Sequence, residues 1–165
     1  MDWAQVEDGL RSAVSQAPST GGPDRHTCWL TTIDPDGKPH VTPVGALWID
    51  GAFWFQTGDR TRKAKNIVRD PRCSIAVATH DFDVVVEGEA VKIGDPGAIA
   101  MLAEAFAAQG WPAEVHESGT GLTAPFNAPG TGPPPWFVYR ITAKTAALVG
   151  TVEGLVEGGA ARFDF

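Results

Sequence analysis

Strong turn signals divide the first part of this chain into short runs of strand-forming residues. The segment 34–37 (Asp-Pro-Asp-Gly) ends a first run, and Asp50-Gly51 separates a second run from a third. Asp-Gly suits a two-residue hairpin turn, whose central residues need positive φ angles. Connections this short join antiparallel neighbours, because a parallel pair needs a crossover of a dozen or more residues. The sequence therefore predicts antiparallel hairpins.

One helical pattern precedes the strands and two interrupt them, without a regular alternation of strand and helix. Such an order favours a mainly β protein with accessory helices, built as an antiparallel barrel whose ends the helices cover. We expect helices at 3–17, 61–69 and 95–110, and strands at 28–33, 39–49, 52–57, 72–78, 84–93, 136–141, 145–149 and 160–165.

Length and composition fit one globular unit. The 165 residues are 43% apolar and 20% charged, which allows a single core of ordinary size. We expect an N-terminal helix within residues 1–18 and a barrel domain over 19–165, with an irregular Pro- and Gly-rich loop at 111–135. Loops of that length are commonly functional lids or flexible segments.

The charge pattern excludes several classes of function. A formal net charge of -7 argues against nucleic-acid binding, which needs a broad basic surface. No apolar run is long enough to cross a bilayer, and Asp2, Glu7 and Asp8 stand where a secretory leader would be basic. These features predict a cytoplasmic protein. Cys28 and Cys73 lack ligand spacing and are expected to be reduced core residues.

Positive charge is concentrated around one short helix of this acidic chain. The first N–H groups of a helix lack partners and carry the positive end of its dipole, so cations there favour an anion site. A solvated basic helix is the alternative. Six of the 13 Lys and Arg residues belong to the cluster: Arg60, Arg62, Lys63, Lys65, Arg69 and Arg72.

Two strand segments complete the candidate site. If the second and third strands pair across Asp50-Gly51, the segment 42–44 (Thr-Pro-Val) comes close to Gln56-Thr57, which directly precede the basic helix. A planar ring could lie against this backbone while its phosphate reaches the helix.

Other motifs do not identify a function. Residues 119–124 spell the dinucleotide pattern GxGxxA, but no strand precedes them and Pro125 follows at once, so the strand-turn-helix context is missing. The four histidines at 26, 40, 80 and 116 lack the spacing of metal ligands, and we expect no metal site.

Two parts of the chain resemble the pyridoxamine 5′-phosphate oxidase-like flavin-binding split-barrel superfamily. One is the aromatic strand followed by Thr-Arg-Lys-Ala-Lys-Asn-Ile (61–67) and Asp-Pro-Arg; the other is 136–142 with the closing segment 161–165. More narrowly, the chain is similar to the flavin/deazaflavin oxidoreductase group found mainly in actinobacteria. The resemblance covers roughly residues 20–165 and implies a split, Greek-key-like barrel.

The resemblance also implies a homodimer with its cofactor at the subunit interface. Arg62 and Lys63 match the pair that holds the cofactor phosphate, and Asn66 matches a polar position one turn later. The strands beside the ring are matched by Thr42, Pro43, Val44, Gln56 and Thr57. The further basic residues of the phosphate oxidases have only Arg140 and Arg162 as candidates here, which disfavours pyridoxine phosphate oxidation.

The expected cofactor is the deazaflavin coenzyme F420, with FMN as the alternative. F420 carries a phosphodiester and an anionic tail, which the additional cations Arg60, Lys65 and Arg69 could follow. The expected activity is hydride transfer between this coenzyme and an unsaturated small molecule, held between Trp111, Phe126 and Trp136. A non-catalytic protein that binds a flavin, deazaflavin or tetrapyrrole is the other hypothesis. Tyr139 could donate a proton, although a structural role suits it better.

Overall fold

The structure, a computed structural model, describes residues 1–14, 27–128 and 130–165. The expected linker and the end of the first helix at 15–17 lie outside these residues. The helices are α1 (Trp3–Ala13), α2 (Arg62–Arg69), α3 (Pro96–Ala108) and the short 3-10 helix η1 (Glu157–Gly159). The strands are β1 (Cys28–Ile33), β2 (Pro39–Val44), β3 (Ala46–Ile49), β4 (Ala52–Thr57), β5 (Arg72–Ala78), β6 (Phe82–Ile93), β7 (Glu114–Val115), β8 (Leu122–Thr123), β9 (Phe137–Gly150) and β10 (Ala160–Asp164).

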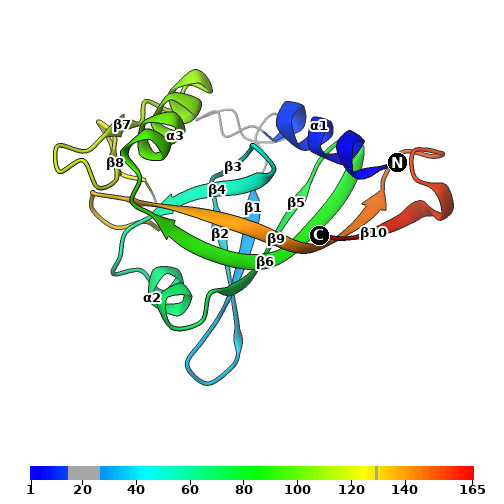
Figure 1. Cartoon of the computed structure of the whole chain (residues 1–165), viewed down its shortest axis with the longest axis horizontal. Coiled ribbons are helices and arrows are strands. Elements are labelled where there is room, and N and C mark those ends of the chain that lie inside the picture. Colours follow the sequence, from blue (N-terminus) through cyan, green and yellow to red (C-terminus); the bar gives the residue numbers. More distant parts are fainter. Residues whose placement is uncertain (15–26, 129) are drawn as a thin grey trace.

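One curled antiparallel sheet forms most of the molecule (Figure 1). Its strands follow the order β2-β1-β5-β6-β9-β4-β3, with β10 beside β9, and β7 pairs with β8 separately. Only Gly45 separates β2 from β3, yet these strands lie at opposite ends of that order. The two edges must therefore meet at Gly45, and the sheet curls into a split barrel, as the sequence predicts.

The expected second strand is in fact two strands with different partners. Residues 39–44 pair with β1, whereas only Ala46–Ile49 pairs with β4, with Ala46 opposite Phe55. The expected pairing of the second and third strands across Asp50-Gly51 is present, but it involves only residues 46–49 of the second strand. Near the C-terminus two expected strands, at 136–141 and 145–149, are one continuous strand, β9. All 12 residues of β6 pair with it.

Two apolar cores lie against the sheet. The larger fills the barrel and includes Val6 and Leu10 of α1 and Ala64 and Ile67 of α2, so both helices close the barrel. In Figure 1, α1 lies above the sheet and α2 below it. The smaller core joins α3 to β4 and to the loop that leads into β9.

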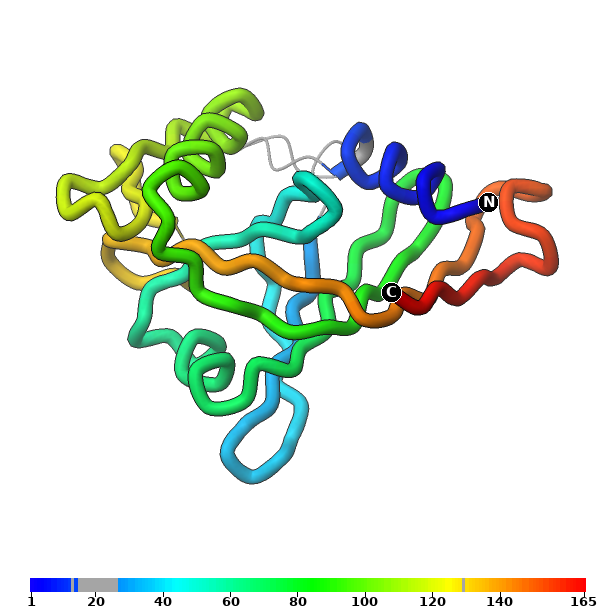
Figure 2. The backbone as a smooth tube through the Cα atoms, in the orientation of Figure 1, coloured from blue at the N-terminus to red at the C-terminus, as the bar shows by residue number. Residues whose placement is uncertain are grey.

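Trp3 and Phe163, near the two chain ends, pack against the larger core, to which both cysteines belong. Both termini lie on the same side of the molecule (Figure 2), and the rings of Trp3 and Phe165 are 4.6 Å apart. Cys28 and Cys73 are buried, as expected, and burial raises the pKa of the Cys73 thiol to about 12. Among the described residues, none of the helices has the length and apolarity of a membrane span.

Candidate functional site

The end of β4 and the start of α2 form a rigid corner. The Thr61 hydroxyl donates to the Gly58 carbonyl at 2.8 Å and accepts from the Ala64 N–H at 3.3 Å, which caps α2. Its oxygen also lies 3.1 Å from the hydroxyl of Thr57, the last residue of β4. A threonine at this position satisfies one of the unpaired N–H groups of the first turn. The corner therefore fixes how α2 leaves the strand.

Arg62 is held by a carboxylate that sequence analysis did not find. Its Nε donates to Asp34 Oδ1 at 2.8 Å, and its Nη2 donates to Asp34 Oδ2. Asp34 is 5% exposed and also accepts from Asn66 Nδ2 at 2.9 Å. Hydrogen bonds from Arg62 and then from Asn66 hold the pKa of this carboxyl below its usual value. Asn66 donates to Thr32 Oγ1 as well, at 3.1 Å.

The basic character of the helix at 61–69 predicts that Arg62 and Lys63 share an exposed face. The structure corrects this prediction, because Lys63 is buried. The lysine is 6% exposed, and its Nζ donates to the Gly130 carbonyl at 2.9 Å. Burial lowers the pKa of the Lys63 ammonium. A buried charge with a carbonyl partner is costly to keep. Such a group is often retained for function, since perturbed ionisable groups cluster at functional sites.

Gln56 carries a buried oxygen that lacks a donor. The residue is 8% exposed, and its Oε1 has no hydrogen-bond partner among the residues that the structure describes. Leaving a buried acceptor unpaired costs about 1–3 kcal/mol. An N–H group on a bound molecule would remove that cost, and flavin and deazaflavin rings both carry one. The residues at this corner therefore fit a ring with an anionic side chain.

The segment 42–44 is the end of β2 and pairs with β1. Thr42 and Val44 pair with Leu30 and Cys28 of β1, and Val44 is buried in the barrel. Pro43 lies on the outer face of the sheet, opposite Trp29. The segment reaches the β4 edge only through Gly45, because the chain crosses between the two sheet edges there.

The three expected pocket aromatics do form one cluster. The ring of Trp111 lies 5.7 Å from that of Trp136 and 6.4 Å from that of Phe126. Trp136 is fully buried and belongs to the smaller core, and its Nε1 donates to the Gly132 carbonyl at 2.7 Å. The cluster and Lys63 are thus connected through the loop at 130–132.

Tyr139 is a core residue, which agrees with a structural role. It is buried and stacks on Phe55, with 5.2 Å between the ring centroids, and burial raises the pKa of its hydroxyl. Among the described residues, no group of His, Cys, Asp and Glu could hold a metal ion.

Gly58 allows the loop at 130–132 to approach the corner. Its N–H donates to the Thr131 carbonyl at 2.9 Å, and a Cβ at this position would lie 2.3 Å from that oxygen. We expect Gly58→Ala to displace the loop and destabilise the protein by about 1–3 kcal/mol. Thermal unfolding measures the change. Gly94→Ala is the control, because a Cβ there meets no atom within 4 Å; equal unfolding temperatures for the two variants would contradict the contact.

A family model described as pyridoxamine 5′-phosphate oxidase matches residues 21–150. The chain belongs to this family. No curated protein matches the chain. The structural comparisons agree with the family assignment and include proteins of different described roles.

Three solved structures illustrate that range. A conserved hypothetical protein of Mycobacterium tuberculosis is 25% identical, with a TM-score of 0.60, and the match covers 88% of this chain and 82% of that one. A protein described as F420 reductase is 16% identical, with a TM-score of 0.54 and coverage of 85% and 94%. A heme binding protein of Mycobacterium smegmatis is 18% identical, with a TM-score of 0.63 and coverage of 99% and 58%. The last two likenesses concern the fold alone.

Proposed function

We propose that this member of the family is an F420-dependent oxidoreductase that transfers a hydride between the bound coenzyme and an unsaturated small molecule. The observation that carries the proposal is the corner between β4 and α2. It holds a buried ammonium, Lys63, and a buried acceptor, Gln56 Oε1, for which the described part of the chain supplies no donor. A ring with an N–H group and an anionic side chain would satisfy both groups.

Each residue of the corner has a role in binding. Lys63 and the outer edge of Arg62 bind the phosphate, and Asn66 holds the Asp34 carboxylate against Arg62. Gln56 Oε1 accepts from the ring, which fixes its orientation. The coenzyme itself supplies the hydride chemistry, so the protein contributes binding, orientation and electrostatics.

Cations beyond the corner favour F420 over FMN. Arg60 and Lys65 are exposed, and they are positioned to follow an anionic tail that FMN lacks. We expect a fluorescence titration of the purified protein with oxidised F420 to give a Kd at or below about 10 μM, and FMN to bind more weakly. A copurified flavin, with no F420 binding below about 1 mM, would support the FMN-dependent alternative.

A turnover assay distinguishes an F420-dependent enzyme from a non-catalytic carrier. We expect reduced F420 on the protein to be reoxidised by at least one acceptor in a panel of enones, quinones and biliverdin-like tetrapyrroles. Binding of F420 without reoxidation by any of them would indicate a non-catalytic flavin, deazaflavin or tetrapyrrole carrier. The likeness to a heme binding protein is the reason to include tetrapyrroles.

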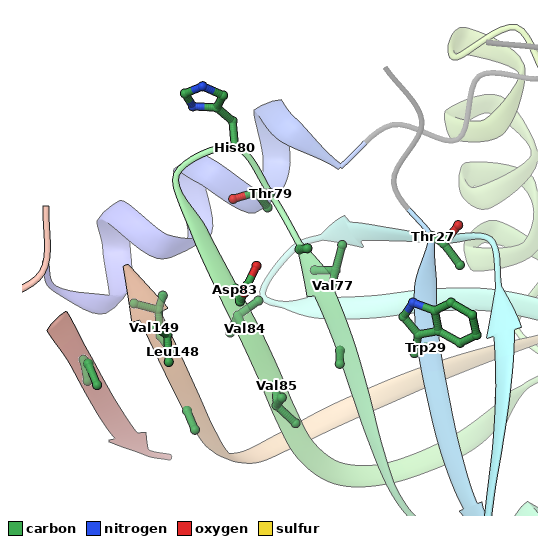
Figure 3. A pocket seen from close by; sticks show the side chains of 15 residues that line it. Thr27, Trp29, Val77, Thr79, His80, Asp83, Val84, Val85, Leu148 and Val149 are labelled. Carbon is green, nitrogen blue, oxygen red and sulfur yellow. The ribbon is translucent and has the colours of Figure 1, made fainter. Parts of the chain in front are cut away.

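We further propose that the protein is a homodimer that pairs through the outer face of the sheet (Figure 3). Trp29, 49% exposed, projects from β1 beside a groove of about 860 Å³. Alanines at 76 and 147 leave space along the groove, and Val85 and Val149 are exposed beside them. A projecting indole and a hollow on one face allow two copies to fill each other's groove about a two-fold axis.

The same face adjoins the candidate ring segment. Pro43 is paired with Trp29 and exposed on this side of the sheet. A second copy seated on Trp29 would therefore also cover Pro43. In this proposal the segment 42–44, which the family resemblance sets beside the ring, would adjoin the subunit interface.

A further inference from the structure

We propose that Asp34 makes the anion site selective for a phosphodiester, which carries one negative charge, over a phosphomonoester, which carries about two. The inference rests on the proposed function, because it takes Arg62 and Lys63 as the phosphate-binding pair. It adds a residue that determines cofactor specificity and that the family resemblance did not identify.

The charge at the corner is smaller than the cluster of cations suggests. Asp34 binds the Nε and Nη2 edge of Arg62 through both of its carboxylate oxygens. Paired in this way, Arg62 and Asp34 have no net charge together. Lys63 then leaves the trio with one positive charge. This charge attracts a doubly charged phosphate about twice as strongly as a singly charged one. Desolvation of the doubly charged phosphate costs about four times as much, because the Born cost grows with the square of the charge.

Asp34 cannot easily move away from this position. Its side chain is nearly completely buried, and Asn66 donates to the same Oδ1 that Arg62 binds. The Arg62 side chain, in contrast, is 62% exposed, so an anion approaches the guanidinium from the side opposite Asp34. The carboxylate therefore remains behind the guanidinium when a ligand binds, and its charge continues to repel the ligand.

A matched pair of ligands isolates this effect. The probes are the 5′-phosphate of 8-hydroxy-5-deazariboflavin and the methyl ester of that phosphate, which share the ring and differ by one charge. At pH 8 we expect the wild-type protein to bind the ester more tightly than the monophosphate. In Asp34→Asn both should bind more tightly, and the monophosphate should gain about tenfold relative to the ester.

The control variant is Asp36→Asn. Asp36 lies in the same turn but pairs with Lys38 and acts on Arg62 only through space, so the ratio of the two affinities should change much less than in Asp34→Asn. An unchanged ratio in Asp34→Asn, or a wild-type preference for the monophosphate, would overturn the inference. If neither phosphate compound binds better than the deazariboflavin without phosphate, the proposed function itself fails.

Measuring the two affinities over a range of pH, with Asp34 and Arg62 unchanged, tests the same charge effect without requiring an Asp34 variant to fold. The second pKa of a phosphomonoester is about 6, so at pH 5 both probes carry one charge. Asp34 stays ionised there because its pKa is lowered, chiefly by Arg62. His40 on β2 also acts on Asp34, so the series uses the His40→Gln background, in which residue 40 is uncharged at every pH. The affinities for the monophosphate and for its methyl ester should become equal at pH 5. A ratio of these affinities that is the same at pH 5 and pH 8 would contradict the inference.

Discussion

Replacing Lys63 with methionine is expected to weaken F420 binding about a hundredfold while leaving the protein folded. The ammonium is the buried cation of the site, and a charge-assisted bond to a phosphate is worth about 1.5–3 kcal/mol. Methionine keeps the apolar stem and removes the desolvated charge, so the unfolding free energy should change by no more than about 1 kcal/mol. Fluorescence titration measures the affinity, and thermal unfolding measures the stability.

Lys65→Met is the matched control for this variant. Lys65 is on the same helix but exposed. Solvent screens the tail contact proposed for it, so its loss should change the affinity by no more than about threefold. Equal losses in the two variants, or normal binding by Lys63→Met, would support the alternative of a solvated basic helix. A variant that binds weakly because it is unfolded is recognised from its melting curve.

Replacing Trp29 with aspartate is expected to convert the protein from dimer to monomer, with the dissociation constant of the dimer rising at least about a hundredfold. Buried tryptophans at interface centres commonly contribute more than about 2 kcal/mol, and a carboxylate in an apolar groove adds a desolvation penalty. The residue is half exposed within one chain, so the fold itself should tolerate the change. Sedimentation velocity over a range of concentrations gives the assembly state.

Val68→Asp provides the comparison for the interface. Val68 is an apolar side chain with 80% exposure on α2, outside the groove, and this variant should stay dimeric. A monomeric wild-type protein, or a Trp29→Asp protein that still dimerises, would exclude this face as the interface.

The regular elements of the fold were predictable because their signals are local. Asp95 accepts from the Ala98 N–H at 2.8 Å and Pro96 begins α3, as the sequence pattern predicts. Asp50 and Gly51 both take positive φ in the turn between β3 and β4. Caps and tight turns depend on a few neighbouring residues, so one sequence is enough to find them.

Contacts between distant segments were not predictable in the same way. Asp34 looks like an ordinary turn residue, and only the curl of the sheet brings it to Arg62, 28 positions later. The burial of Lys63 depends on Gly130, 67 positions away. Gly45 likewise gives no signal that the sheet edges meet there. Each of these features is set by tertiary packing, which helical or strand periodicity does not record.

A crystal structure of the protein with F420 tests the central claim most directly, through the distance from Lys63 Nζ to the nearest phosphate oxygen of the coenzyme. The account predicts a charge-assisted bond of about 2.7–2.9 Å, with a ring N–H donating to Gln56 Oε1. A coenzyme phosphate bound elsewhere, with Lys63 still on the Gly130 carbonyl and Gln56 Oε1 still without a donor, would contradict it.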